Sequence, residues 1–450
     1  MRELEKERFF LVLGLGRATT PIVQFLLWQE KKVFAHDEVS EKGKPFLANK
    51  YFTFVSLEEI PKLPEPLITV ISPGISEDSQ LVLFAKKKGE VISDIEFVYQ
   101  ILRKRAGIKI VAITGTNGKS TTTALLGNIL QKAKKRVFVG GNIAPGKPAG
   151  AALFTKKDIF IFEVSSFQLE KIKDFRPHGA VLLNIGEDHL DRYGNLEKYI
   201  AAKANIFFNQ KEDDFAVLNY DDCRVRTIAK KIKAKIFWFS LRKKIQGIFW
   251  QNGIGYIKLP GEEEKEILRT TDVALKGKFN LANTLAVSLV AYLFGLGKKE
   301  IIKGIRSFPG LPHRLEFVRK VGSVQFINNS MATNPAAFAA SLSVFPKPVI
   351  LIAGGKNKGF SLKDYERPMK EFAKYIILIG EVQQALFNTL SPSLRQKTYL
   401  ASSLKEAVKK ALKIAQKNDI VLFSPGFASF DMFKDFVDRG NSFKRIVRSL

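Results

Sequence analysis

Short apolar runs alternate with segments of helical periodicity along most of the chain. Each run is bounded by glycine, proline or acidic residues, which predicts buried strands linked by helices. We therefore expect an α/β fold in which the first and the last part of the chain each form a doubly wound sheet. The runs cover residues 9–13, 33–35, 67–71, 323–327, 348–353, 375–379 and 419–423.

The centre of the chain carries a strand, a glycine turn and a helix in direct succession. Residues 108–113 are mostly apolar and β-branched, 114–118 hold two glycines, and 122–132 have helical periodicity. Free N–H groups at the helix start attract phosphate, and the helix dipole adds to them. A lysine at 119 can reach the terminal phosphates, and the hydroxyl of Ser120 or Thr121 can bind Mg²⁺.

This turn departs from the common phosphate-loop pattern at one position. G-x-x-x-x-G-K-[ST] requires glycine where Ile113 stands, so the loop that begins at Gly115 is shorter. The alternative is an ordinary glycine turn with a solvated lysine. Strand, glycines, Lys-Ser-Thr and helix all agree, and together they favour ATP binding.

Two further strands end in acidic residues. The run DIFIFEVSSFQLE brings Glu163 to a strand end, where it can complete the oxygen shell of Mg²⁺ or lie exposed to water. The run VLLNIGEDHLDRY ends in Glu187, Asp188, His189 and Asp191. His189 is then a metal ligand or an ion-paired loop residue, and the pattern alone favours the loop.

A lysine lies on the apolar face of a predicted helix over residues 195–209. Lys203 follows Leu196 by seven positions, which places both on one face. A buried ammonium is costly unless it is paired or modified. The pattern alone favours snorkelling, in which the amine reaches water.

The first predicted sheet carries two turns at strand ends. GLGRATTP follows the first strand and an aspartate, Asp37, follows the second, as at the start of a dinucleotide-binding unit. Thr19 replaces the third glycine of that pattern, so the evidence for NAD is weak. SPGI at 72–75 is either a ligand-facing turn or an ordinary Pro-Gly turn.

Length, charge and cysteine usage limit the classes of protein that fit. The 450 residues correspond to about three domains of ~150 residues. The net charge of +28 is spread along the chain, so it indicates a lysine-rich surface or anionic substrates rather than a nucleic-acid partner. The chain has no apolar run near ~20 residues and a charged start, MRELEKER, so neither membrane insertion nor a signal peptide is expected. Cys223 is the only cysteine, which fits the cytoplasm.

Taken together, the motifs give the chain a recognisable family likeness. The motifs named at the end of this paragraph occur along the chain in the order in which the Mur ligases have them, so the chain resembles that family over nearly its whole length. The resemblance implies a Rossmann-like UDP-substrate domain (1–102), a central P-loop ATPase-type α/β domain with a mainly parallel sheet (103–310) and a Rossmann-like amino-acid domain (311–450). The motifs are SPGI, GTNGKST, GGNI, EVSSFQLE, LNIGEDHLDRY, AAKANIF, GLPHR, ATN, GGKNKG and SPGFASFDMFKDFVDRGNSF.

The resemblance also implies an activity. Mur ligases are ATP-dependent, ADP-forming amide ligases of peptidoglycan precursor synthesis that phosphorylate a carboxylate and then join an amine to it. SSFQLE and the last motif point to the branch that adds D-glutamate to UDP-N-acetylmuramoyl-L-alanine. We expect ATP and two Mg²⁺ ions as cofactors, and a monomer. A related ligase of the folylpolyglutamate type with another amino acid, or a divergent relative of low activity, stays open.

Site residues follow from the resemblance position by position. Lys119, Glu163, His189 and Lys203 would be catalytic. Ser120 or Thr121 with Glu163 would hold one Mg²⁺, and His189 with a carbamylated Lys203 the second, which reverses the preference for snorkelling. ATP would be bound by Gly115, Thr116, Asn117, Gly118, Lys119, Ser120, Thr121, Asn280, Asn283 and Arg314. The UDP substrate would face Gly14, Leu15, Gly16, Arg17, Asp37, Ser72, Pro73, Gly74 and Asn142, and D-glutamate would face Thr333, Lys358, Ser429, Phe430 and Phe436.

Three positions depart from the family pattern. Phe279 stands where His is usual before the first adenine-side asparagine, and Asn329 and Met331 stand where Asp and Lys are usual. The change removes one acid and one lysine near the nucleotide. Loss of a charged partner at a buried site can cost several kcal/mol, and Lys356 is a candidate substitute.

Overall fold

The computed structural model describes residues 8–273, 275 and 277–450. The charged stretch 1–7, on which the expectation about a signal peptide rests, lies outside the described residues. The chain forms two compact units, one from the described parts of Met1–Ala274 and Ala282–Phe308, the other from Leu275–Leu281 and Pro309–Leu450. The second unit thus includes a short segment, 275–281, that the predicted boundaries place in the central domain.

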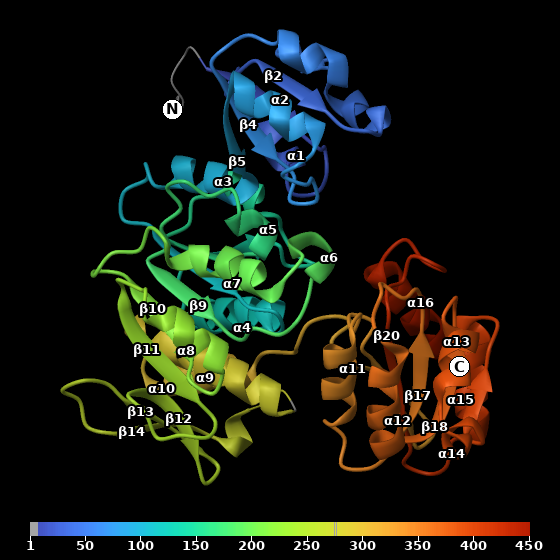
Figure 1. Ribbon diagram of the computed structural model, residues 1–450. Helices are drawn as coiled ribbons and strands as arrows, with labels where there is room; N and C mark the ends of the chain where they lie inside the picture. Colours follow the sequence, from blue (N-terminus) through green and yellow to red (C-terminus); the bar gives the residue numbers. More distant parts are fainter. Residues whose placement is uncertain (1–7, 274, 276) are drawn as a thin grey trace. The chain divides into compact units, whose positions relative to one another are not determined.

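The first unit begins with a five-stranded parallel sheet in the order β3-β2-β1-β4-β5 (Figure 1). Strand order reverses direction between β1 and β4, so the loops that follow these two strands diverge and leave a crevice for ligands. The strands are β1 (Phe9–Leu13), β2 (Val33–His36), β3 (Phe52–Phe54), β4 (Leu67–Ile71) and β5 (Gly89–Ser93). The helices are α1 (Thr20–Trp28), α2 (Gln80–Lys88) and α3 (Asp94–Leu102).

The same unit contains a nine-stranded sheet in the order β14-β13-β12-β11-β10-β9-β6-β8-β7. Its pairs are parallel from β7 to β12, and only β12-β13-β14 are antiparallel. The carboxyl ends of β7, β8, β6 and β9 therefore share one edge. The strands are β6 (Lys109–Thr114), β7 (Val137–Gly141), β8 (Ile159–Glu163), β9 (Gly179–Leu182), β10 (Phe215–Asn219), β11 (Lys235–Ser240), β12 (Gly247–Gln251), β13 (Ile254–Lys258) and β14 (Lys265–Arg269).

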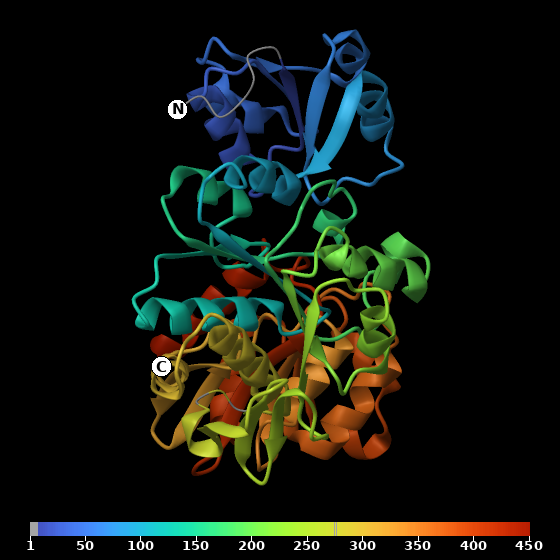
Figure 2. The ribbon, with the colours of Figure 1, turned by 90° about the vertical axis from the view of Figure 1, so that its left-hand side faces the viewer.

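Burial explains why the central strands are continuous apolar runs. Every residue of β8 is buried, and in β6 only Lys109 is exposed, because helices cover the sheet and α4 packs on β7 and β8. Figure 2 shows α3 at the base of the first sheet. The helices are α4 (Lys119–Lys132), α5 (Ser166–Leu169), α6 (Leu190–Tyr193), α7 (Leu196–Ala204), α8 (Cys223–Ala229), α9 (Lys278–Leu293, which begins in the other unit) and α10 (Lys298–Arg306).

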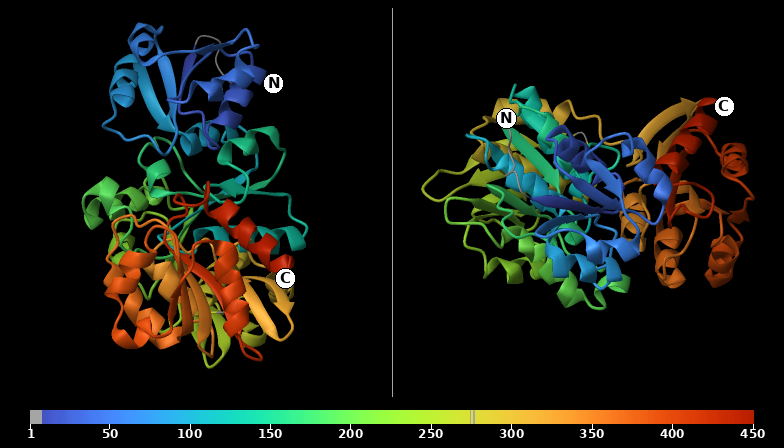
Figure 3. Two further views of the ribbon diagram at one scale, coloured as in Figure 1. Left: turned by 90° about the vertical axis from the view of Figure 1, so that its right-hand side faces the viewer. Right: turned by 90° about the horizontal axis from the view of Figure 1, so that it is seen from above.

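The second unit is a six-stranded sheet in the order β15-β16-β20-β17-β18-β19, parallel except for β15-β16. The last helix, α16, packs on β15 and β16 (Figure 3). The strands are β15 (Glu316–Val321), β16 (Val324–Asn328), β17 (Val349–Gly354), β18 (Ala373–Ile379), β19 (Thr398–Leu400) and β20 (Ile420–Gly426). The helices are α11 (Pro335–Leu342), α12 (Glu366–Phe372), α13 (Gln383–Thr389), α14 (Pro392–Arg395), α15 (Leu404–Ile414) and α16 (Phe436–Arg448).

The expected α/β architecture is confirmed, including a mainly parallel central sheet. The domain boundaries at 102/103 and 310/311 stay predictions. Across the described ranges, no helix combines the length and the apolar character that a membrane span requires.

Candidate active site

The glycine turn after β6 has the backbone shape that a phosphate requires. Gly115 has φ +153° and Gly118 has φ +87°, and α4 starts directly after Gly118. A side chain at 118 would be strained, and its Cβ would lie 2.6 Å from Oδ1 of Asn283. The helix begins three residues earlier than the sequence predicts, so Lys119 is its first residue.

Asn184, just beyond β9, holds this loop in shape. Its carbonyl accepts the Thr116 N–H at 2.9 Å, and its side-chain oxygen accepts the Asn117 N–H at 2.9 Å. Its amide donates back to the Asn117 carbonyl at 3.0 Å. The loop is therefore preformed. Asn184 is part of the motif LNIGEDHLDRY, but no sequence pattern assigns it this role.

Two lysine amines meet on one carbonyl oxygen of this loop. Nζ of Lys119 donates to the Gly115 carbonyl at 2.9 Å and to the Thr116 carbonyl at 2.8 Å. Nζ of Lys203 donates to the same Gly115 carbonyl at 3.0 Å. Lys119 therefore donates to the backbone of its own loop and not only to solvent, and its role in binding phosphate stays a prediction.

Lys203 is 1% exposed, so the snorkelling favoured by the sequence pattern is wrong. Its amine lies 4.5 Å from the ring centre of Tyr199 on the same helix. Burial, and then the charge of Lys119, lower the pKa of Lys203 well below its usual value. A lysine that gives up its proton becomes a nucleophilic amine, which is the form that reacts with carbon dioxide to give a carbamate.

Glu163 ends β8, and its exposed alternative is also wrong, because it is 3% exposed. The strand pairing places it opposite Ile113, directly before the phosphate-binding loop. Its Oε1 accepts the Asn142 amide at 3.4 Å, whereas its Oε2 is buried and has no hydrogen-bond partner among the residues that the structure describes. A buried carboxylate oxygen left open beside such a loop fits a divalent cation, which prefers oxygen ligands.

His189 lies in the loop after β9 with φ +55° and a side chain that is 45% exposed. Its ring packs edge-on against Phe167 at 4.8 Å, and its Nε2 is 3.8 Å from Asp188. The side chain of Asp191 lies outside the described residues. Within the described ranges, no three His, Cys, Asp or Glu side chains form a group that could hold a metal. A cation here would therefore also need oxygen from Ser120, a carbamate or the nucleotide.

The residues predicted to face UDP gather where β1, β2 and β4 end. Oδ2 of Asp37 accepts the Leu15 N–H at 2.7 Å, and a Cβ on Gly14 would lie 2.8 Å from Ser72 Cβ. Thr19, which replaces the third glycine, donates its hydroxyl to the Gly14 carbonyl and so closes the turn. Gly16 lies in the turn after β1, and Pro73 and Gly74 lie in the turn after β4. Asn142, in contrast, follows β7 in the central sheet.

Two arginines connect this crevice to the central sheet of the same unit. Nη2 of Arg17 donates to the carbonyls of Ile143 and Gly146. Nη1 of Arg192 donates to the Pro73 carbonyl at 3.1 Å, and its Nη2 pairs with Glu170 at 2.7 Å. Arg192 is part of the LNIGEDHLDRY motif, which assigns it no role, and the structure shows that it holds the SPGI turn.

In the second unit, the residues predicted for D-glutamate follow the carboxyl ends of β16, β17 and β20, with Phe436 as the first residue of α16. Ser429 is 2% exposed, and Phe430 is 62% exposed, with the Lys358 amine 5.6 Å from its ring centre. The carbonyl of Phe436 accepts the Ser330 hydroxyl at 2.8 Å, and Thr333 follows in the same loop as Ser330. Asn280 and Arg314 also belong to this unit, whereas Asn283 belongs to the first.

The departure at Asn329 is satisfied within its own surroundings. Its amide donates to the Ser424 hydroxyl at 3.1 Å, and its side-chain oxygen accepts the Leu315 N–H at 3.1 Å. These partners are neutral, so the amide meets the demands of a buried position without a cation. Phe279 is 39% exposed. Nothing in the structure explains Met331.

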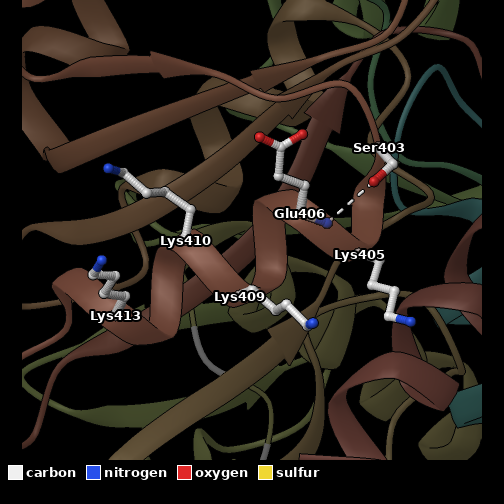
Figure 4. Close-up of a pocket in the computed structure, with 6 residues that line it drawn as sticks. All are labelled: Ser403, Lys405, Glu406, Lys409, Lys410 and Lys413. Atoms are coloured by element: carbon white, nitrogen blue, oxygen red, sulfur yellow. Dashed lines mark hydrogen bonds between the residues drawn. The ribbon is translucent and has the colours of Figure 1, made fainter.

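A basic surface on α15 accounts for part of the positive charge. Four lysines of this helix border a shallow hollow of about 460 Å³ (Figure 4). Their amines point in different directions, so they do not converge on one anion. The hollow is lined by Ser403, Lys405, Glu406, Lys409, Lys410 and Lys413.

Comparison with known proteins identifies the family of the chain. The Mur ligase middle domain matches residues 113–291, and the Mur ligase glutamate ligase domain matches 313–427. The UDP-N-acetylmuramoylalanine–D-glutamate ligase of Caldanaerobacter subterraneus is 37% identical over 466 residues, covering 100% of this chain and 99% of its own. That of Geotalea uraniireducens is 40% identical, covering 98% and 97%.

This chain belongs to the Mur ligase family. Members are ATP-dependent, ADP-forming amide ligases that use Mg²⁺, and this chain is one of them. Among solved structures, the UDP-N-acetylmuramate–alanine ligase of Thermotoga maritima has the same fold, with a TM-score of 0.63 at 17% identity, covering 98% of this chain and 99% of that one. The expected family is confirmed, while the roles of single residues stay predictions.

Proposed function

We propose that this Mur ligase adds D-glutamate to UDP-N-acetylmuramoyl-L-alanine in peptidoglycan precursor synthesis. Relatives that carry this activity in their names match over the full length of the chain. The observation that carries the chemistry is the meeting of the Lys119 and Lys203 amines on the Gly115 carbonyl. The open oxygen of Glu163 provides a ligand for a cation in the same sheet edge.

The phosphate-binding loop provides the first half of the reaction. Backbone N–H groups of the loop and the start of α4 bind the triphosphate, and Lys119 leaves the Gly115 carbonyl to bind its terminal phosphates. The substrate carboxylate attacks the γ-phosphorus, the bond to ADP breaks, and an acyl phosphate results. Both reactants are anions that repel each other, so most of the rate acceleration comes from the residues that hold them in line.

The second half joins an amine to the activated carboxyl. The amine nitrogen of D-glutamate attacks the acyl carbon, the bond to phosphate breaks, and the nitrogen loses a proton as the amide forms. Thr333, Lys358, Ser429, Phe430 and Phe436 present hydroxyls, a cation and aromatic rings, which suit an amino acid with two carboxylates. Gly14, Leu15, Gly16, Arg17, Asp37, Ser72, Pro73, Gly74 and Asn142 hold the UDP-linked substrate.

Two Mg²⁺ ions fit the donors that the chain offers. Ser120, or Thr121 beside it, and Glu163 would hold one, and His189 with a carbamylated Lys203 the other. Bound Mg²⁺ would neutralise phosphate charge during transfer. Asn280 and Asn283 would contact the adenine and Arg314 the phosphates. We further propose that the enzyme is a monomer and acts in the cytoplasm, where its single cysteine, Cys223, stays reduced.

The test is a phosphate-release assay with ATP, Mg²⁺ and UDP-N-acetylmuramoyl-L-alanine. D-glutamate is compared with L-glutamate, L-lysine and meso-diaminopimelate as the amine. We expect turnover with D-glutamate and little with the others. Turnover with another amino acid but not with D-glutamate would reject the proposed substrate, and ATP binding without ADP formation would indicate a divergent, inactive relative.

A further inference from the structure

A fully buried arginine lies in the second unit without a carboxylate among its described hydrogen bonds. Arg439 on α16 is 1% exposed. Its Nε donates to the Ser330 hydroxyl at 3.1 Å, its Nη2 to the Ser330 carbonyl at 2.9 Å, and its Nη1 to the Ala428 carbonyl at 3.0 Å. All three acceptors are neutral oxygens, so these bonds fix the guanidinium without cancelling its charge.

The charge persists at neutral pH. Burial lowers the pKa of Arg439 to about 10, and the charge of Asp431 acts in the opposite direction. Asp431 is engaged elsewhere, since its Oδ2 accepts the Glu381 N–H at 2.9 Å. Charges act over longer distances in a protein interior than in water, so a guanidinium held here affects nearby ligands.

The partners of Arg439 belong to the loops that carry the predicted amino-acid pocket. Ser330 lies three residues before Thr333, and its hydroxyl also donates to the Phe436 carbonyl at 2.8 Å. Ala428 directly precedes Ser429. One guanidinium therefore connects the start of α16 with the segment at Ala428, 11 positions earlier, and with the segment at Ser330, 109 positions earlier.

A fourth segment is connected through Ala428. The Lys356 N–H donates to the Ala428 carbonyl at 2.9 Å, two positions before Lys358. The preceding residue, Gly355, has φ +137°, and a Cβ there would lie 2.2 Å from the Ala428 carbonyl and 3.1 Å from Nη1 of Arg439. Only glycine allows the loop with Lys358 to approach the guanidinium this closely.

We propose that Arg439 is the positioning residue of the amino-acid pocket, where it aligns Thr333, Ser429 and Phe436 and adds the positive charge that selects an acidic amino acid. The proposal rests on the proposed function of this pocket. Arg439 acts through the loops and through its field, and it does not touch the reacting atoms. A purely structural arginine would hold the same loops but would not alter which amino acid the enzyme prefers.

The experiment compares Arg439→Lys with Arg439→Met in the full-length enzyme. Lysine keeps the charge but loses the three-pronged geometry, whereas methionine loses both. We expect KM for D-glutamate to rise about tenfold in Arg439→Lys and about 100-fold in Arg439→Met, as for weakened charge-assisted contacts. KM for ATP should stay within about twofold, because nucleotide binding uses other residues.

Selectivity separates positioning from simple loss of structure. The ratio of kcat/KM for D-glutamate to that for the neutral D-glutamine should fall about tenfold in Arg439→Met and little in Arg439→Lys. Arg445→Met, on the exposed side of the same helix, is the matched control and should leave every constant unchanged. Ser330→Ala removes one partner and is a milder variant, so it guards against misfolding of the arginine variants.

Each outcome supports or overturns the proposed role of Arg439. A rise in KM for D-glutamate with Ser330→Ala and Arg439→Lys, and a loss of selectivity with Arg439→Met, supports the proposal. Equal rises in the KM values for ATP and D-glutamate, or unchanged selectivity in Arg439→Met, overturns it. If the unmodified enzyme uses another acidic amino acid, the proposed function fails, and the same comparison is made with that amino acid.

Discussion

Lys203 in the first unit and Arg439 in the second are both 1% exposed, and both donate to backbone carbonyls. Their titration differs. The pKa of Lys203 is lowered well below its usual value by burial and by Lys119, whereas burial lowers the pKa of Arg439 only to about 10. The lysine therefore loses its proton much more readily than usual, whereas the arginine keeps its charge at neutral pH.

Because of this difference in pKa, we expect Lys203 and Arg439 to have different roles. A neutral amine is a nucleophile, so Lys203 can take up carbon dioxide and become an anionic oxygen ligand beside the phosphate-binding loop. A guanidinium that keeps its charge is unreactive, so Arg439 can only hold its neighbours and act by its field. Exchange of the two residue types between the sites should therefore fail at both.

The largest expected effect comes from Lys119, which shares the Gly115 carbonyl with Lys203. Lys119→Ala should lower kcat about 10³-fold or more, because a cation that stabilises transferring phosphate is lost. It should also raise the pKa of Lys203, since the charge of Lys119 is one of the causes that lower it. Steady-state phosphate release and ¹³C NMR with labelled bicarbonate measure the two effects.

Lys132→Ala is the control for this variant, because Lys132 is exposed at the other end of α4. It should leave turnover within about twofold of the unmodified enzyme. Normal turnover in Lys119→Ala would show that this lysine does not bind the phosphates.

Lys203 itself should give the next largest effect. Lys203→Ala should lower kcat about 100-fold or more, and short carboxylic acids should restore part of the activity by replacing the carbamate oxygen. Lys203→Arg should be as inactive as alanine and should not respond to acids, because a charged guanidinium fills the position. Lys198→Ala, exposed on the same helix, serves as the control. Absence of rescue at every acid concentration would count against a carbamate at 203.

The sequence alone predicts the position of those groups that are placed by residues close to them in the chain. The glycines at 115 and 118, the helix after them and Glu163 at a strand end all follow from short-range patterns, and the structure has each of them. The antiparallel strands β13 and β14 lie outside the apolar runs and motifs from which the sequence analysis predicts strands. Strands at a sheet edge are short and half-exposed, so their apolar signal is weak.

Long-range partners could not be predicted in this way. Lys203 is bonded to a carbonyl 88 positions earlier, and Arg192 to one 119 positions earlier. Periodicity placed Lys203 on an apolar face but could not show whether its amine reached water, because that depends on which loop covers it. The sequence does not single out Arg439 within the last motif, since a charged residue in a helix is usually solvated.

Asp94 is a buried carboxylate, and burial raises its pKa, whereas burial lowers the pKa of the two cations. Its expected effect, on stability, is the smallest considered. Asp94 at the start of α3 is 1% exposed, and burial raises its pKa from 3.8 to about 6 although the Gln168 amide donates to both oxygens. The folded protein therefore holds this proton more tightly than the unfolded chain. Stability contributed by the protonated acid is present below pH 3.8 and is lost as the pH rises through 6.

Asp94→Asn should remove this dependence, because the amide keeps an oxygen for Gln168 and cannot ionise. We expect the melting temperature of the unmodified enzyme to fall by a few degrees between pH 5 and 7 relative to the variant, from a free-energy difference of at most about 3 kcal/mol. Calorimetry of both proteins at each pH gives the difference, in which the titration of histidines such as His178 and His313 cancels. Parallel curves for the two proteins would mean that Asp94 ionises as easily in the folded protein as in water, and that Gln168 alone offsets its burial.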